Sequence, residues 1–379
     1  MKHVTRKLSP KASQLRGENV SKCNQLHEVI KLGVDTHSQQ YTFARMADHH
    51  GIQPAQKLTP LAFLEFLKKQ LTLAKRVVMV YEAGPYGFAL HREATALGVE
   101  CLVCAPERLS RGRKRVNDKI DATELLSRLD RHLAGNTTAL RLVRVPSIQQ
   151  EISRRLARER NTYRKERQRW IARGRSLLHS LGIHRPGRWW EPLECDRLLK
   201  SIEGRYGQEI AAQIRQELER DLEMLDIVQK KRDELTRRLC QDSKAKTPLR
   251  IKGIGHLSSE ILDREIVDWN RFANRRQVAS YTGLCPGEAS SGQSQMSLSI
   301  DKHGNPRLRV VLVELAWLLS KFQPDYRRLQ RWKWVFEKGA PKGMRKKAAV
   351  ALARQLAVDL WRIKTGRVKP EDLGLKLAA

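Results

Sequence analysis

VIKLGVD at residues 29–35 is the stretch that decides the fold, because it is an apolar run that ends in an acid. A second apolar run, RVVMVYE at residues 76–82, ends in the same way. Short apolar runs bounded by polar residues are typical of buried strands. Asp35 and Glu82 are therefore predicted to stand at the ends of two strands, and adjacent strands would bring the two acids side by side.

A helical segment adds two more acids. In NDKIDATELL at residues 117–126, Asp118 and Asp121 lie three residues apart and so share one face of a predicted helix. Two strand-end acids and such a pair form the arrangement that a nuclease-type fold needs to hold a divalent metal beside a phosphodiester. Four close carboxylates repel one another unless a cation neutralises them, which favours Mg²⁺. The alternative is that each acid only caps a turn or a helix.

The charge balance points to nucleic acid as the partner. The 379 residues contain 73 Lys+Arg against 41 Asp+Glu, a formal net charge of +32. This charge is spread along the whole chain, which disfavours a membrane surface as the partner. No apolar run is long enough to span a bilayer, and the N-terminus has no apolar core for a signal peptide. We expect a cytoplasmic prokaryotic protein that associates with the nucleoid when it is bound to DNA.

Four segments are predicted along the chain. Residues 1–25 are polar and basic and are expected to form a flexible tail. Residues 26–145 alternate strands with helices, which predicts a mixed α/β sheet of ribonuclease H-like type. The pair Cys101 and Cys104 is interpreted as two small buried residues of a strand, because zinc would need a second pair. The expected elements are strands at 27–37, 76–82 and 99–106, an antiparallel partner at 39–47, and helices at 60–71, 84–98 and 119–133.

Residues 146–246 lose all strand signals and predict a helical arm. Two long charged helical stretches flank RPGRWWEP at residues 185–192, which suggests a helical hairpin or a coiled-coil linker. One interpretation is a solvated structural arm. The favoured one is an arm that pairs with another protomer while an arginine face follows phosphates. That face comprises Arg154, Arg155, Arg158, Arg160 and Arg164.

Residues 247–379 are expected to form a mainly helical C-terminal domain with a turn like that of a helix-hairpin-helix. Lys252, Gly253 and Gly255 surround this turn, whose backbone N–H groups could approach a phosphate closely. An ordinary structural joint is an equally good interpretation.

The stretch GLCPGEASSGQSQMSLSIDKHGNPRLR at residues 283–309 follows, and it is expected to be a loop. Ser290 or Ser291 beside a glycine could act as a nucleophile on phosphorus if cationic and amide donors clamped a phosphate there. Composition alone favours a Ser/Gly-rich surface loop instead. The candidate donors are Lys302, Asn305, Arg307 and Arg309.

Several motifs in this order resemble a known family. KLGVDTH, VYEAGPYG, NDKIDA, GLCPGEASSG and IDKHGNPRLR together resemble the DEDD-type insertion-sequence transposases of the one-ten family and its eleven-eleven branch. The resemblance covers about residues 28–366. It implies a RuvC-like N-terminal domain, a helical coiled-coil linker and a C-terminal transposase domain with a nucleophilic serine, acting as a recombinase directed by a structured bridge RNA.

The resemblance also implies roles for particular residues. Asp35, Glu82, Asp118 and Asp121 would be the four metal-binding acids, and Ser291, ahead of Ser290, would attack the scissile phosphodiester to form a phosphoserine intermediate. Exchange between donor and target DNA would follow without net hydrolysis, in a dimer or tetramer in which one protomer's acids complete another's serine site. The chain departs from its relatives at residues 293–299, where they often carry basic residues and glycines.

Two other functions remain open at this point. A metal-dependent, structure-specific nuclease of the Holliday-junction resolvase type would need the four acids but not the serine. A basic nucleic-acid-binding protein would use the acids only structurally.

Overall fold

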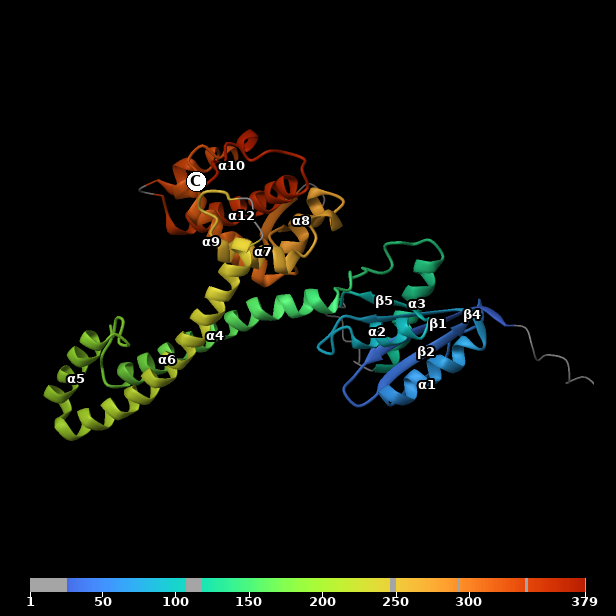
Figure 1. The fold of residues 1–379 in the computed structure, drawn as a ribbon, viewed down its shortest axis with the longest axis horizontal. Coiled ribbons are helices and arrows are strands. Elements are labelled where there is room, and N and C mark those ends of the chain that lie inside the picture. Colours follow the sequence, from blue (N-terminus) through green and yellow to red (C-terminus); the bar gives the residue numbers. More distant parts are fainter. Residues whose placement is uncertain (1–25, 107–117, 246–249, 292–293, 338–339, 379) are drawn as a thin grey trace, which may run out of the picture. The chain divides into compact units, whose positions relative to one another are not determined.

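A computed structural model of the chain describes residues 26–106, 118–245, 250–291, 294–337 and 340–378 (Figure 1). The predicted tail at 1–25 lies outside these residues, as do the side chains of 243–245 and 288–297. Contacts within the chain divide it into two compact units, residues 1–146 and 147–379.

The first unit contains a five-stranded mixed sheet in the order β3-β2-β1-β4-β5. β1 pairs antiparallel with β2 and parallel with β4, while β4 pairs parallel with β5. The mixed α/β sheet and the antiparallel partner predicted from the sequence are therefore confirmed. The strands are β1 (His27–Thr36), β2 (Tyr41–Ala47), β3 (Gln53–Leu58), β4 (Ala74–Glu82) and β5 (Glu100–Cys104).

Helices pack on both faces of this sheet. On one face, α1 (Pro60–Leu71) and α2 (Ala89–Ala96) bury the apolar residues that alternate along β1 and β4. On the other face lies α3 (Asp118–Leu133), against Val78 and Val80. Because successive strand residues point to opposite faces, this two-sided cover explains why both runs read as almost continuously apolar.

The edge strand β3 was not predicted from the sequence. Its segment QPAQKL contains a proline and is mostly exposed, so it lacks the apolar alternation that marks a strand. Proline is tolerated at a sheet edge because it has no N–H to donate to a further strand. At the opposite edge, burial raises the pKa of Cys101 to about 12, which agrees with a buried structural thiol.

In the second unit, α4 (Ile148–Ser180) and α6 (Gln208–Ala245) pack along each other and form the predicted helical arm (Figure 1). A shorter helix that was not predicted from the sequence, α5 (Pro192–Tyr206), lies at the reversal between them. The indole of Trp189 fills the space beside Gly174, where a Cβ atom would overlap its ring, and donates a 3.0 Å hydrogen bond to the carbonyl of Ile171.

The remaining helices of this unit surround a single apolar core. α7, α8, α9 and α12 supply most of its buried side chains. None of the helices in the described parts of the chain combines the length and apolar character needed to cross a bilayer. The elements are α7 (His256–Ile266), η1 (Trp269–Arg271), α8 (Arg275–Thr282), α9 (Pro306–Phe322), α10 (Arg327–Gln330), α11 (Lys333–Phe336), α12 (Lys342–Lys364) and η2 (Glu371–Leu373).

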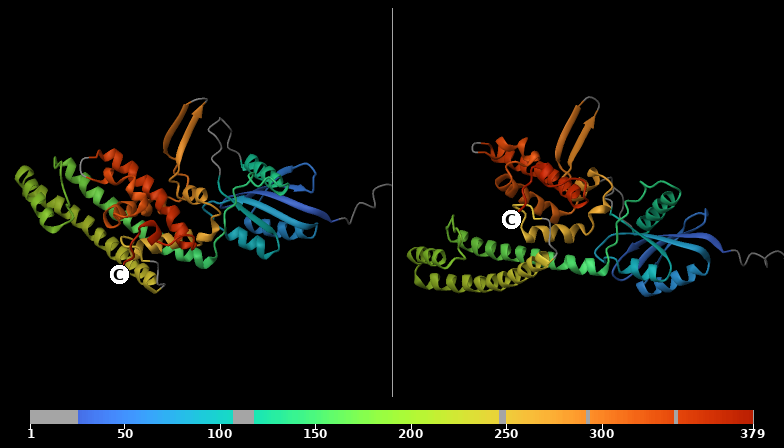
Figure 2. Two further views of the ribbon diagram at one scale, coloured as in Figure 1. Left: turned by 90° about the horizontal axis from the view of Figure 1, so that it is seen from above. Right: turned by 45° about the horizontal axis from the view of Figure 1, so that its top comes forward.

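The serine-containing segment was predicted to be a loop, but it forms a two-stranded antiparallel hairpin. β6 (Pro286–Ser291) pairs with β7 (Ser294–Ile300), and Figure 2 shows the hairpin extending away from the helices of its unit. The sequence hides these strands because serine and glycine are poor strand formers whose presence normally marks turns.

Candidate functional site

Gly33 brings helix α3 directly against strand β1. A Cβ atom at this position would overlap the backbone oxygen of Ala122 and the backbone nitrogen of Leu126. Glycine is therefore required for the close approach, although its backbone needs no unusual conformation. Asp35 lies two residues further along β1 and shares this face of the strand with Gly33. The close packing thus carries the start of α3 toward Asp35.

The carboxyls of Asp35, Asp118 and Asp121 interact electrostatically. The pKa of Asp35 is raised above its ordinary value, mainly by burial and then by the negative charges of Asp118 and Asp121. The pKa of Asp121 is also raised, by burial first and then by Glu124 and Asp118. The fold therefore brings together three of the four predicted acids, at some electrostatic cost.

Glu82 faces the same side of the sheet. The paired register of β1 and β4 reaches Val34 opposite Tyr81, so Asp35 and Glu82 are the next residues of the two strands. Arg128 of α3 lies near Glu82, with 3.9 Å between Nη1 and Oε1. The Arg128 side chain is buried, and its Nε also donates a 3.0 Å hydrogen bond to the carbonyl of Ala139. Arg128 therefore supplies positive charge on the glutamate side of the acids.

Lys57, on the edge strand β3, forms an ion pair with one of the helical acids. Its Nζ lies 3.1 Å from Oδ2 of Asp118, and this contact lowers the pKa of that carboxyl. Across the described residues, no three or more histidine, cysteine, aspartate or glutamate side chains lie close enough together to hold a metal ion. The acids offer the oxygen donors that Mg²⁺ prefers, so their donor chemistry fits this ion. One of these donors, Asp118, is neutralised by Lys57.

The predicted nucleophile lies in the second unit, near the tip of the β6–β7 hairpin. The backbone of Ser291 pairs with that of Ser294 at the last position of the ladder. The side chains of Ser290 and Ser291 are outside the described part of the chain, so the prediction that Ser291 carries the reactive hydroxyl is not tested.

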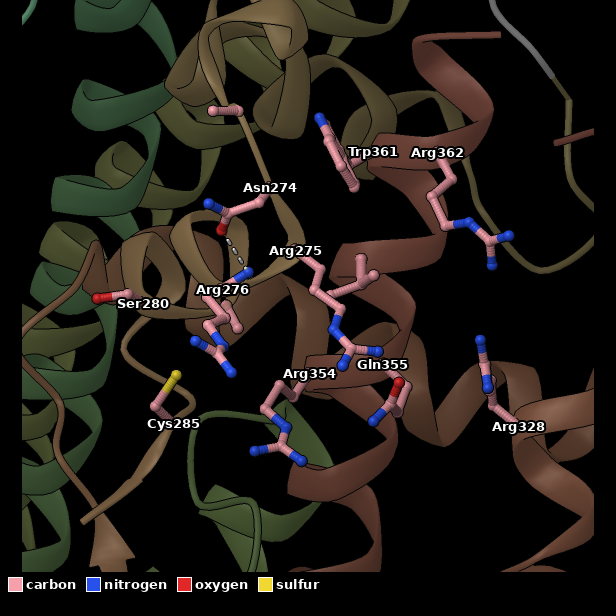
Figure 3. A pocket seen from close by; sticks show the side chains of 13 residues that line it. Asn274, Arg275, Arg276, Ser280, Cys285, Arg328, Arg354, Gln355, Trp361 and Arg362 are labelled. Carbon is pink, nitrogen blue, oxygen red and sulfur yellow. Dashed lines mark hydrogen bonds between the residues drawn. The ribbon is translucent and has the colours of Figure 1, made fainter. Parts of the chain in front are cut away.

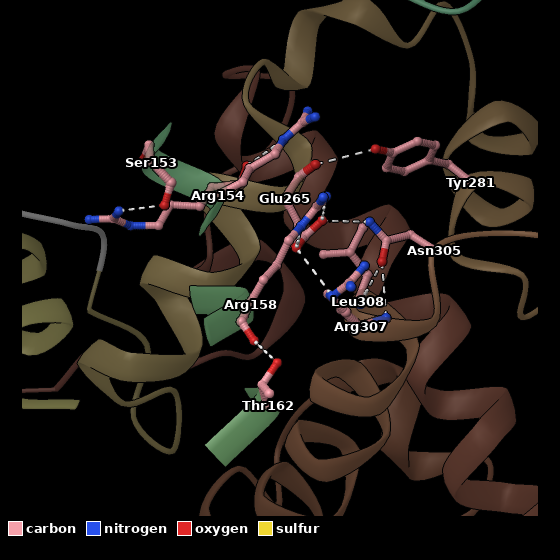
Figure 4. Close-up of polar contacts among 10 residues, drawn as sticks. Ser153, Arg154, Arg158, Thr162, Glu265, Tyr281, Asn305, Arg307 and Leu308 are labelled. Atoms are coloured by element: carbon pink, nitrogen blue, oxygen red, sulfur yellow. Dashed lines mark hydrogen bonds and ion pairs between the residues drawn. The ribbon is translucent and has the colours of Figure 1, made fainter. Parts of the chain in front are cut away.

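Glu265, on α7, was not predicted as a functional residue from the sequence, yet its side chain connects α7 to α4 and to the start of α9 (Figure 4). Its side chain is 1% exposed and accepts two 3.0 Å hydrogen bonds from Arg158 on α4. It also accepts a 2.9 Å bond from the amide of Asn305. Burial acts to raise the pKa of Glu265, but these bonds and the charges of Arg158 and Arg307 outweigh it, and the pKa is lowered. A glutamate at the end of a helix gives no sequence signal of such a role.

Asn305 is committed to contacts within the protein. Its side-chain oxygen accepts hydrogen bonds from the backbone N–H groups of Arg307 and Leu308 and so caps α9. Its amide donates to Glu265, as described above. Asparagine followed by proline is a recognised start for a helix. The predicted phosphate donor thus has a clear structural role.

The other predicted phosphate contacts lie on several elements. Gly253 has a φ of +92° and packs against Phe322 between α6 and α7, and Gly255 is the N-cap of α7. Arg309 donates to the carbonyl of Thr282 at 3.2 Å. The two lysines, Lys252 and Lys302, are exposed, as is Arg307.

Arg158 of the predicted phosphate-tracking face instead binds Glu265, and its neighbours on α4 also make contacts within the protein. Arg154 donates to the carbonyl of Arg264 at 3.1 Å, and Arg160 donates to Thr236 at 2.7 Å. These contacts join α4 to α7 and α6. The periodicity of arginines along a helix does not reveal which of them turn inward.

Comparison with known proteins gives a consistent match. Residues 247–331 match the family described as Transposase IS116/IS110/IS902 family. The candidate transposase y4rJ of Sinorhizobium fredii is 34% identical over 322 residues, covering 79% of this chain and 80% of that protein. A second candidate transposase of that organism, y4qE, is 33% identical over 66% of this chain and 60% of its own length. The transposase for insertion sequence element IS1111A of Coxiella burnetii is 32% identical over 30% of this chain and 31% of its own length.

Proposed function

The chain belongs to the IS116/IS110/IS902 family of transposases, and we propose that it recombines DNA under the guidance of a structured RNA, through a phosphoserine intermediate at Ser291. Transposition of an insertion sequence requires DNA to be cut and rejoined. The net charge of +32 supports binding to donor DNA, target DNA and guide RNA, because each is a polyanion.

The observation that carries the proposal is the gathering of Asp35, Asp118 and Asp121 where α3 meets β1, with the two aspartates at 35 and 121 raised in pKa. Burial and the nearby negative charges make these acids costly to ionise, and acids perturbed in this way are concentrated at functional sites. Together with Glu82 they would hold Mg²⁺, which stabilises the charge that develops on a phosphodiester under attack. Because these acids do not lie close enough together here to hold the ion, binding it requires them to approach one another and Asp118 to exchange Lys57 for the ion.

The serine would carry the covalent step. The hydroxyl oxygen of Ser291 attacks the scissile phosphorus and loses its proton, while the bond from phosphorus to a deoxyribose oxygen breaks and that oxygen gains a proton. The phosphodiester energy is retained in the phosphoserine bond. Attack by a second deoxyribose hydroxyl then releases Ser291 and rejoins the strands. The acids and the serine would come from one protomer or from two protomers of an oligomer.

Replacing Ser291 with alanine is the direct test, with Ser290→Ala as its matched control. The expected result is that Ser291→Ala abolishes strand transfer and the covalent protein–DNA adduct, while binding of DNA and RNA is retained. Ser290→Ala is expected to keep both activities. The adduct is measured by denaturing electrophoresis of labelled DNA.

A second candidate function is a nuclease that uses only the acids, and it is supported by their assembly within the first unit alone. Under that function the Ser291→Ala variant is expected to cleave DNA at the wild-type rate. Neither the variant nor the wild type is expected to form a covalent protein–DNA adduct. Asp35→Asn is expected to stop the reaction under both functions. Undiminished recombination by Asp35→Asn would show that the acids are structural and would overturn both.

RNA guidance has a separate test. RNA that copurifies with the chain is expected to map to a structured non-coding stretch beside its reading frame. Recombination by protein stripped of all RNA would overturn the guided mechanism and leave a protein-only transposase.

A further inference from the structure

A pocket of about 1030 Å³ opens between α8 and α12 in the second unit (Figure 3). This volume lies at the upper end of the range typical of small-molecule sites, roughly 300–1,000 Å³. Its wall is rich in groups that donate hydrogen bonds to anions. These polar lining residues include Asn274, Arg275, Arg276, Arg328, Arg354, Gln355 and Arg362.

The charge of this arginine pocket is only partly balanced. Arg328 and Arg362 share one buried carboxylate, Asp359, at 3.0 and 3.5 Å. Within the described residues, neither Arg275 nor Arg276 makes an ion pair with a carboxylate, and Arg354 makes none either. Figure 3 shows these three side chains lying around the open centre of the pocket. Like charges that converge without counter-ions raise the local potential and attract an anion.

Two of these arginines lie at the N-terminal end of a helix, where positive charge is unfavourable. Arg275 and Arg276 occupy the first turn of α8, which contains no acidic residue. The positive end of the helix dipole and the N-terminal N–H groups disfavour cations there and favour anions. Asn274 satisfies two of those N–H groups, so the helix start is properly capped despite its charge. A local arrangement that costs stability in this way is typical of a binding site.

We propose that the arginine pocket binds the phosphodiester backbone of a nucleic acid and anchors it beside the serine hairpin. Guanidinium groups match phosphate oxygens in a paired geometry, and several of them from two helices suit consecutive phosphates better than a single small anion. This proposal rests on the proposed function, because it takes the bound polyanion to be the DNA or the guide RNA of that reaction.

The connection to the hairpin gives the anchor its purpose. Cys285 lines the pocket and is followed directly by β6, which ends at Ser291. At about 3.3 Å per strand residue, the chain advances roughly 20 Å between these two residues. The pocket arginines therefore position the nucleic acid and do not touch the bond that the serine would attack.

The test is equilibrium binding by the full chain carrying Arg275→Gln and Arg276→Gln, measured without divalent metal. The probes are a duplex DNA and a single-stranded RNA of the same sequence, each at several salt concentrations. The affinity for at least one probe is expected to fall about tenfold, and the slope of its salt dependence is expected to fall by roughly one for each lost phosphate contact. The probe that loses affinity identifies the polyanion that the pocket holds.

Two control variants separate pocket binding from general charge. Arg237→Gln with Arg238→Gln removes the same charge from an exposed pair on α6 and is expected to weaken binding far less. Arg275→Lys with Arg276→Lys keeps the charge but not the paired guanidinium geometry, so its affinity is expected to fall between those of the wild type and the Gln variant. Both pocket residues are exposed, and the Gln variant relieves repulsion at the start of α8, so its thermal unfolding midpoint is expected not to fall.

Equal losses in the α6 control and the pocket variant, or no loss for either probe, would overturn the proposal. Because binding is measured without catalysis, failure of the Ser291→Ala or Asp35→Asn tests leaves this result intact. Loss of binding together with normal adduct formation at saturating DNA would confirm that the pocket anchors and does not catalyse.

Discussion

Asp35 combines a functional prediction with a cost in stability. Its pKa is raised, by burial first and then by Asp118 and Asp121, so the folded state prefers the protonated form more than the unfolded state does. Below the ordinary pKa of 3.8, Asp35 is protonated in both states and does not lower the free energy of unfolding. As the pH rises from there through the raised pKa of the folded state, its ionisation lowers the free energy of unfolding. At neutral pH the charged side chain therefore opposes folding.

Asp35→Asn is accordingly expected to keep or raise the thermal unfolding midpoint at pH 7 in the absence of metal, while recombination is lost. The difference from the wild type should shrink as the pH approaches 4, and added Mg²⁺ should stabilise the wild type alone. Calorimetry at pH 4 and pH 7, with and without Mg²⁺, measures both effects. A large destabilisation at pH 7 without metal would show that the charged carboxylate has a structural partner.

Asp130 on the same helix provides the contrast. It lies 2.6 Å from Nζ of Lys31, whose side chain is 5% exposed. Asp130→Asn is expected to lower stability by roughly 1–3 kcal/mol, because it weakens the partner of a buried cation. Two aspartates that face the same sheet thus have opposite effects on folding.

At the scale of elements, the approach of α3 to β1 depends on the absence of a side chain at Gly33. Gly33→Ala is expected to destabilise the first unit by about 1–3 kcal/mol, because the added methyl group meets backbone atoms of α3 that cannot move aside cheaply. It should also weaken Mg²⁺-dependent activity, since α3 carries two of the acids. Urea unfolding and recombination assays measure the two effects.

Gly51 is the matched control for this substitution. A Cβ atom there meets nothing within 4 Å, so Gly51→Ala is expected to change stability by less than about 0.5 kcal/mol. Full activity in Gly33→Ala would mean that the position of α3 does not govern the acids.

At the scale of the whole chain, one acid in each unit, Asp35 and Glu265, is expected to contribute to stability with the opposite dependence on pH. Asp35 opposes folding of the first unit at neutral pH, whereas Glu265 supports folding of the second. The lowered pKa of Glu265 means that its contribution is present above its ordinary value of 4.5 and is lost as the pH falls through the lowered one.

Glu265→Gln is expected to cost the second unit about 3 kcal/mol at pH 7, because Arg158 loses its charged partner in a buried setting. The cost should decline as the pH falls below 4. The exposed Glu219 provides the control, since Glu219→Gln is expected to have little effect. A cost that is independent of pH would show that the carboxylate charge of Glu265 is not what joins α4 to α7.

The sequence by itself determined the elements whose pattern is strong and local. The apolar runs that end in Asp35 and Glu82 predicted two neighbouring strands, and the long charged stretches predicted the helical arm. Hydrophobic periodicity reports burial directly, so these features needed no tertiary information. The same reasoning placed four acids in the first unit at positions that share one side of its sheet.

Tertiary structure alone decided which polar side chains turn inward and which converge from distant segments. Arg158 and Glu265 are 107 residues apart and form one buried pair, and the arginine pocket joins Arg275 to Arg354 across two helices. The strands that carry Ser291 likewise pair with each other although serine and glycine disfavour strands. Local propensity reports only the intrinsic preference of each segment for helix, strand or turn. These features instead depend on contacts between segments that are far apart in the sequence.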